Sequence, residues 1–327
     1  MKPNAAPTLS DVAAHAGVSL ATASRVLNGS TRVVKAELKE VVLASARTLG
    51  YTVNRQAQAV ARGTSDTVAL VVGDIADPYF ASIASGVVRV ADERGLIVTI
   101  TATGPYAGEA SVERERAALV ALREQRPRAI VLAGSRVAGA EPPMSERVAV
   151  VGAGAAGLRT VVVDNRGGAA QLARELRRLG YTDFAVIAGP EELITVRDRV
   201  DGFRSVVGDV RVEHAEFSRD GGHRAMSALL DSGARPECVF AVSDVMAVGA
   251  MAALREAGIR PGEDVAVAGF DDIPLVADVT PALTSVALPL ADIGARALRL
   301  ALADEADERD SAPVAAQVRL RASTPGR

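Results

Sequence analysis

The sequence predicts an α/β protein with a small helical head followed by a larger core of parallel sheets flanked by helices. Residues 8–49 carry three short stretches with apolar residues at helical spacing. From residue 67 onward, short β-branched runs alternate with helical stretches of ten or more residues, which is typical of βαβ units. The alternation restarts near residue 159, so the core is expected to have two similar lobes.

Residues 8–28, TLSDVAAHAGVSLATASRVLN, predict a helix-turn-helix. Apolar residues recur at helical spacing on both sides of AGVS, in which Gly17 permits a sharp turn and Ser19 can cap the next helix. Thr8 and Asp11 have the spacing of a capping box for the first helix. The second helix of such a motif enters the DNA major groove. A helical hairpin in a protein core would show a similar pattern, so this stretch alone does not decide the function.

The head is expected to close with a third helix over residues 36–49, which GY at 50–51 ends. We expect domain boundaries at 1–53 for the head, 54–65 for a linker and 66–327 for the core. The linker stretch NRQAQAVARG is too short to be a stable helix by itself in water. A solvated linker without a DNA contact is the alternative interpretation.

The charge is distributed unevenly. Residues 1–63 carry eight Lys or Arg and three Asp or Glu, a net charge of +5, although the whole chain carries −3. A basic head on an acidic body suits a protein of which only the head binds a polyphosphate. The beginning of the chain has no apolar signal-peptide core and no run spans a membrane, so we expect a cytoplasmic protein without membrane contact. The single cysteine, Cys238, lies in a buried-strand pattern and fits a reducing compartment.

Enzyme motifs are few. VAVVGAGAAG at 148–157 contains the G-x-G-x-x-G pattern of dinucleotide sites, but it leads into another strand rather than a helix. The three histidines are scattered, without partners at metal-ligand spacing on a shared helix face. No nucleophile elbow or phosphate-binding loop occurs. We therefore predict no catalytic residues, no metal and no cofactor, and interpret the glycines as a tight loop.

The order of several motifs resembles the lac/purine repressor (LacI/GalR) family of transcriptional regulators. These motifs are TLSDVAAHAGVSLATASRVLNG, LGYTVNRQAQAVARGT, DPYF, VDN, RDRVDGF, VSDVMAVGAM, GEDVAVAGFDDIP and PALTSVALP. The resemblance covers nearly the whole chain. It implies a periplasmic-binding-protein-like core that the chain crosses three times, with a small-molecule effector between two lobes. It also implies a hinge helix that folds on DNA beside its twin from a second subunit.

The resemblance assigns DNA-contact positions within the head and the hinge. Leu20 and Ala21 occupy the family's specificity positions, and Lys39 replaces a phosphate-contacting arginine of the third helix. Val60 stands where the family wedges a leucine into the minor groove, and Val53 replaces the usual proline. The DNA-binding candidates are Thr8, Ser19, Leu20, Ala21, Thr22, Ser24, Arg25, Asn28, Lys39, Tyr51, Asn54, Arg55, Ala57 and Val60.

Effector contacts are carried over in the same way. The family's arginine matches Arg199, for which a surface salt bridge with Asp198 or Asp201 is the alternative. Its stacking aromatic matches Phe217, and core roles are the alternatives for this residue and for the DPYF pair. An aromatic face, an arginine and carboxylates favour a sugar-like ligand. The effector-binding candidates are Tyr79, Phe80, Thr195, Arg199, Phe217, Ser243, Asp244 and Asp271.

The expected protein is a sequence-specific DNA-binding regulator, with repression as its usual action and a small molecule controlling its operator affinity. One short recognition helix covers a half-site, so a homodimer on a pseudo-palindromic operator is predicted. QVRLRASTPGR at 317–327 has no leucine heptads, which argues against a coiled-coil tetramer. Two other functions fit the sequence less well. An enzyme fused to a DNA-binding head is disfavoured because the sequence shows no catalytic constellation, and a solute-binding protein for transport is disfavoured because the sequence shows no export signal.

Overall fold

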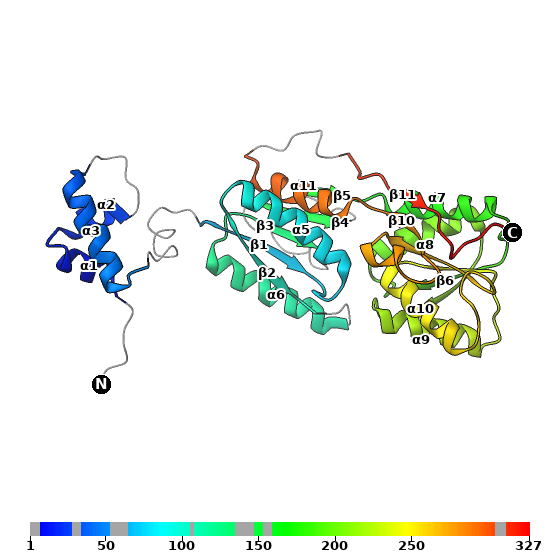
Figure 1. The fold of residues 1–327 in the computed structure, drawn as a ribbon. Coiled ribbons are helices and arrows are strands. Elements are labelled where there is room, and N and C mark those ends of the chain that lie inside the picture. The colour runs from blue at the N-terminus through cyan, green and yellow to red at the C-terminus, as the bar shows by residue number, and fades with distance from the viewer. Residues whose placement is uncertain are drawn as a thin grey trace. The chain divides into compact units, whose positions relative to one another are not determined.

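The computed structural model describes residues 7–27, 34–52, 65–104, 108–134, 147–152, 159–304 and 312–327. The chain divides into two compact units, Met1–Asp66 and Thr67–Arg327 (Figure 1). Within the described residues, no helix is both long and apolar enough to cross a membrane.

The first unit is a three-helix head made of α1 (Leu9–His15), α2 (Leu20–Leu27) and α3 (Ala36–Leu49). The predicted capping box is confirmed, because the Thr8 hydroxyl accepts from the Asp11 amide and the Asp11 carboxylate accepts from the Thr8 amide. Gly17 has φ +64°, a conformation that favours glycine in the turn between α1 and α2. The small core of the head consists of Val12, Ala13, Ala23, Val42 and Ala46.

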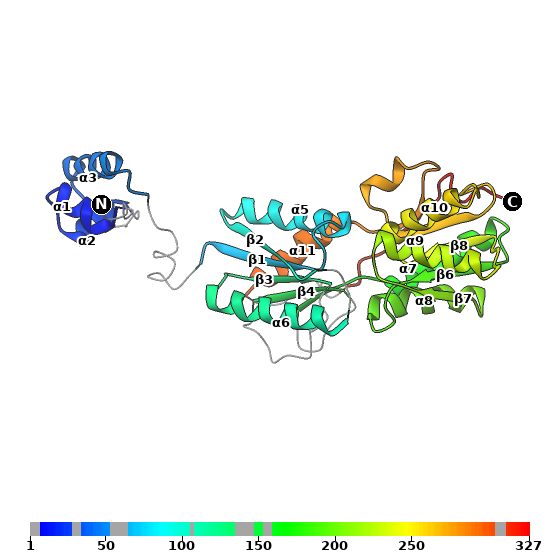
Figure 2. The ribbon, with the colours of Figure 1, turned by 90° about the horizontal axis from the view of Figure 1, so that it is seen from below.

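The first lobe of the core is built on a parallel sheet in the order β2-β1-β3-β4-β5. Its strands are β1 (Thr67–Val72), β2 (Ile97–Ala102), β3 (Ile130–Ala133), β4 (Val148–Gly152) and β5 (Arg159–Val162). Helix α5 (Pro78–Glu93) covers one face and α6 (Gly108–Gln125) the other (Figures 1 and 2). Because β5 begins at Arg159, the glycine-rich stretch continues into a strand rather than a cofactor-binding helix.

The second lobe has a sheet in the order β11-β10-β9-β8-β6-β7, parallel except for β11. The strands are β6 (Phe184–Ala188), β7 (Arg211–His214), β8 (Cys238–Ala241), β9 (Ala266–Asp271), β10 (Thr284–Ala287) and β11 (Gln317–Arg319). Helices α7 (Asn165–Arg178) and α8 (Ile194–Val207) pack together, as do α9 (Arg219–Asp231) and α10 (Asp244–Glu256). A short 3₁₀ helix, η1 (Pro274–Ala277), follows β9.

Three crossings connect the lobes. The chain leaves the first lobe between β5 and α7, and returns between β10 and α11 (Leu290–Leu302). Helix α11 packs on α5 and on β3, β4 and β5, and β11 then belongs to the second sheet again. The parallel sheets and three crossings confirm the predicted two-lobed α/β fold.

The return of α11 requires close helix packing. A Cβ built on Gly86 of α5 would lie 1.7 Å from the Ala291 carbonyl oxygen, and one on Gly294 of α11 would lie 2.0 Å from the Ile83 carbonyl oxygen. Both distances are far below any permitted contact, so side chains at these two positions would push the helices apart. The two glycines therefore allow α11, from the far end of the chain, to complete the first lobe.

Candidate functional site

The head exposes part of α2 as a candidate DNA-reading surface. Leu20 is 53% exposed, and Ala21 and Arg25 are exposed as well. Ser19 caps the helix by accepting from the Thr22 amide at 3.1 Å. Thr22 and Ser24 are half-buried, and Asn28 lies outside the described residues. An apolar side chain exposed beside an arginine suits a thymine methyl and a guanine edge.

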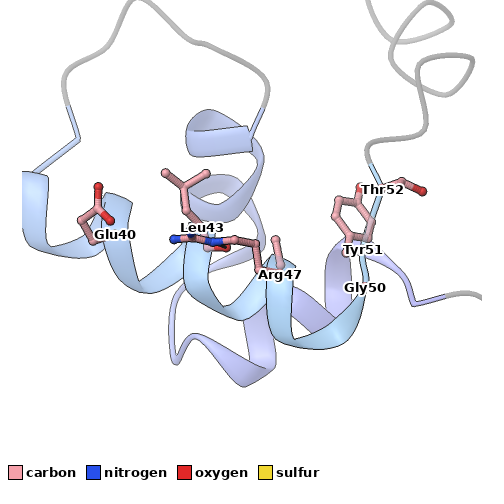
Figure 3. A pocket seen from close by; sticks show the side chains of 7 residues that line it. Glu40, Leu43, Arg47, Gly50, Tyr51 and Thr52 are labelled. Carbon is pink, nitrogen blue, oxygen red and sulfur yellow. Dashed lines mark hydrogen bonds between the residues drawn. The ribbon is translucent and has the colours of Figure 1, made fainter.

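Other DNA-contact candidates lie elsewhere on the head. The Thr8 hydroxyl is hydrogen-bonded to Asp11 in the capping box, whereas Lys39 is exposed on α3. Tyr51 is half-buried and lines an open pocket of about 560 Å³ that runs along α3 to Glu40 (Figure 3). Arg47 folds back over this pocket and donates from Nε to the Leu43 carbonyl at 3.3 Å. The hinge candidates Asn54, Arg55, Ala57 and Val60 lie outside the described residues.

In the second lobe, Arg199 is the centre of a buried polar cluster. It lies on α8 and is only 2% exposed. Its Nη2 donates to Asp271 Oδ1 at 2.8 Å, its Nε to Asn165 Oδ1 at 2.9 Å and its Nη1 to the Val242 carbonyl at 2.6 Å. The guanidinium carbon lies 3.8 Å from the centre of the Phe270 ring. The surface salt bridge with Asp198 or Asp201 is therefore the wrong alternative, because the partner is Asp271 at the end of β9.

Two buried carboxyl groups lie in this cluster. Asp271 has φ +107°, and burial raises its pKa to about 7, although Arg199 acts in the opposite direction. Asp244 begins α10 and accepts from the Ile273 amide at 2.8 Å and from Ser285 Oγ at 2.6 Å. Burial and the neighbouring Asp271 raise the pKa of Asp244 well above its usual range. The cluster lies at the carboxyl ends of β8 and β9, where parallel sheets bind ligands.

The remaining second-lobe candidates surround the cluster with different degrees of burial. Ser243 is buried and caps α10, with its Oγ accepting from the Met246 amide at 3.4 Å. Thr195 is half-buried on α8, one helical turn before Arg199. Phe217 is half-buried against Gly189, where an added Cβ would lie 2.4 Å from the Phe217 ring.

The first lobe contributes the beginning of α5. Asp77 caps this helix by accepting from the Tyr79 amide at 2.9 Å, and burial raises its pKa to about 6. Burial raises the pKa of Tyr79, and the negative charge of Asp271 acts in the same direction. Phe80 is 3% exposed and packs in the apolar core, with its ring edge-on to Tyr79.

Three polar residues of this site were missed by sequence reasoning: Asp77, Asn165 and Ser285. Asp77 was visible as a helix cap before a proline, and Asn165 as the polar residue of the VDN stretch. Ser285 lies in a short apolar strand and gives no local signal. In the described part of the chain, no group of three or more His, Cys, Asp or Glu could hold a metal ion.

A helix-turn-helix head on a two-lobed core with a buried charged cluster defines a DNA-binding regulator with a ligand-binding core. Residues 8–54 match the family described as bacterial regulatory proteins, lacI family, and residues 173–324 match a periplasmic binding protein-like domain. The chain belongs to the LacI family and is a transcriptional regulator rather than an enzyme.

Relatives of known name support this assignment. The chain is 33% identical to the HTH-type transcriptional regulator CelR of Thermobifida fusca, over 94% of both chains. It is 34% identical to the ribose operon repressor of Halalkalibacterium halodurans, over 90% of this chain and 88% of the relative. These regulators match the head and the core together.

Two solved structures show the same architecture. The lac repressor dimer bound to operator and the anti-inducer ONPF superposes with a TM-score of 0.80 at 23% identity, over 98% of this chain and 100% of that one. A CelR–cellobiose complex superposes with a TM-score of 0.65 at 30% identity, over 97% of this chain and 99% of that one.

Proposed function

We propose that this chain is a cytoplasmic repressor that binds a pseudo-palindromic operator as a homodimer, and that a sugar bound in its core controls the operator affinity. The observation that carries the sugar proposal is the buried Arg199–Asp271 pair at the carboxyl end of β9. Tyr79, at the beginning of α5, is the proposed contact from the first lobe. Guanidinium and carboxyl groups donate to and accept from paired hydroxyls. The cellobiose complex of CelR and the name of the ribose operon repressor support this ligand class.

The proposed division of labour follows the chain. Residues 1–53 read DNA through α2, with Arg25 on a guanine edge and Leu20 and Ala21 on thymine methyls. Residues 54–65 form the hinge, in which Val60 enters the minor groove. Residues 66–327 bind the effector and the second subunit.

The proposed control acts through the two lobes of the core. A ligand that contacts Tyr79 of the first lobe and Arg199 of the second favours one relative arrangement of the lobes. It changes operator affinity only by its difference in affinity for the two arrangements, typically about 1–3 kcal/mol. DNA must change the affinity for the ligand by the same factor. The sign of this change separates induction from co-repression.

A ligand screen tests the proposal. Thermal unfolding of the full-length protein is followed with cellobiose, ribose and a panel of other mono- and disaccharides, and operator binding is measured on DNA selected from a random pool. We expect one sugar to raise the melting temperature and to change the operator affinity. Tyr79→Phe should lower the affinity for that sugar by about tenfold, which is the contribution of one hydrogen bond.

Tyr181→Phe is the matched control for this screen. The Tyr181 hydroxyl donates to the Pro325 carbonyl at 2.6 Å, away from the cluster. Loss of that hydroxyl should leave sugar affinity unchanged. A protein that selects operator DNA but responds to none of the sugars would contradict the proposed ligand class, and equal losses in both variants would contradict the placement at Tyr79.

A further inference from the structure

Arg199 is linked to the crossings between the lobes as well as to the candidate ligand site. The first crossing runs through Val163, which forms a bridge with Val314 of the last crossing. The Val314 amide donates to the Val162 carbonyl at 2.7 Å. These two crossings are therefore held side by side by backbone hydrogen bonds.

Asn165 connects Arg199 to this pair of crossings. It is the first residue of α7, immediately after the first crossing, and is 2% exposed. Its backbone amide donates to the Val163 carbonyl at 2.9 Å, and its side-chain Nδ2 donates to the same oxygen at 3.4 Å. Its Oδ1 accepts from Arg199 Nε at 2.9 Å, so a single side chain contacts both the crossing and the arginine.

The Nη2 atom of Arg199 is connected to the remaining crossing through Asp271. The Asp271 carboxylate accepts from Arg199 Nη2. The backbone carbonyl of Asp271 accepts from the backbone amide of Leu288 at 3.3 Å. Leu288 lies between β10 and α11, where the chain returns to the first lobe. All three crossings are thus connected in one hydrogen-bonded chain that passes through Asn165, Arg199 and Asp271.

We propose that Asn165 is a positioning residue that couples Arg199 to the interlobe crossings, so that a ligand on Arg199 acts on the crossings themselves. This inference deepens the proposed function and rests on its assignment of Arg199 as a ligand contact. Without the Asn165 acceptor, Arg199 Nε is buried without a partner, and the guanidinium loses one of the contacts that fix its plane. Asp271, held at a positive φ, then loses a fixed partner, and the Leu288 bond weakens with it.

Hydrogen–deuterium exchange in the full-length, DNA-free protein tests this coupling, with fragmentation that resolves the Leu288 amide. Asn165→Leu keeps the size of the side chain but removes the acceptor, and it should speed exchange at Leu288 by about tenfold, the equivalent of one hydrogen bond to a charged group. Asn165→Asp removes the Nδ2 donor to Val163 but retains an oxygen acceptor for Arg199, so it should restore protection at Leu288. Arg178→Gln, an exposed change on the same helix, is the control and should have no effect.

A double variant separates positioning from general stability. If Asn165 acts through Arg199, Asn165→Leu should add nothing to the faster exchange that Arg199→Leu produces at Leu288. The amide of Val239, in the central strand β8, should keep its protection in Asn165→Leu. Additive effects, an unchanged Leu288 amide or equal acceleration at Val239 would overturn the proposal. Asn165→Ala is measured in the same way if the leucine variant does not fold.

The exchange measurement contains no sugar. A failed sugar screen therefore contradicts the ligand class alone, whereas an unchanged Leu288 amide contradicts the coupling alone.

Discussion

Replacing Arg199 with leucine should show how strongly the second lobe depends on its buried ion pair. The substitution removes a cation that is 2% exposed and leaves three acceptors without their donor: the Asp271 carboxylate, Asn165 Oδ1 and the Val242 carbonyl. Removal of one partner of a buried pair costs about 3–5 kcal/mol, because the remaining charge is uncompensated. We expect a loss of about that size in the free energy of unfolding at pH 8, where a buried Asp271 carboxyl without Arg199 is most unfavourable.

The loss should depend on pH. Burial already raises the pKa of Asp271 to about 7 in the folded protein, above its usual value near 4, and loss of Arg199 raises it further. An acid with a raised folded pKa contributes stability that is fully present below its unfolded pKa and is lost as pH rises through its folded pKa. Arg199→Leu should therefore be destabilised less at pH 5 than at pH 8.

Denaturant unfolding at both pH values measures the effect, with Arg199→Leu/Asp271→Asn as the control. Asparagine removes the unpaired charge and is among the residues that best tolerate positive φ. The double variant should recover much of the stability at pH 8 and show little pH dependence from this site. Equal losses in the single and double variants, or a single-variant loss below about 1 kcal/mol, would refute the view of a buried charge that depends on its partner.

Further predictions concern the head, the hinge and the first lobe. Arg25→Ala should weaken cognate operator binding by about 1–3 kcal/mol in fluorescence anisotropy at fixed salt, and unchanged binding would remove α2 from the DNA-reading role. Thr8→Ala should lower the stability of the head by about 1 kcal/mol, since it breaks the capping box, and unfolding followed in residues 1–66 checks this. Val60→Gly should weaken operator binding while sugar affinity stays the same, because glycine removes the wedge and disfavours a hinge helix; titration with both ligands decides it. Gly294→Val should destabilise the first lobe by about 1–3 kcal/mol or more, because its Cβ meets the Ile83 carbonyl, and a wild-type melting temperature would contradict that packing.

Local patterns in the sequence were sufficient for the three helices of the head and for the alternation of strands and helices in the core. The capping box at Thr8 and Asp11 joins residues three apart, so it is visible in the sequence and is confirmed in the structure. The turn at Gly17 and the alternation of strands with helices are likewise encoded within a few residues. The spaced motifs then indicated the family, and with it Arg199 and Asp271 as functional candidates.

The contacts among those candidates were decided only by the tertiary structure. Arg199 lies 34 residues from Asn165 and 72 residues from Asp271, and no local pattern shows which acidic side chain meets the guanidinium. Sequence proximity instead suggested Asp198 and Asp201 on the same helix. The true partner depends on how α8 packs beside α7 and β6, because that packing brings the Arg199 side chain to the ends of β8 and β9. Burial then leaves Arg199 only those acceptors that the assembled lobe brings within hydrogen-bond distance.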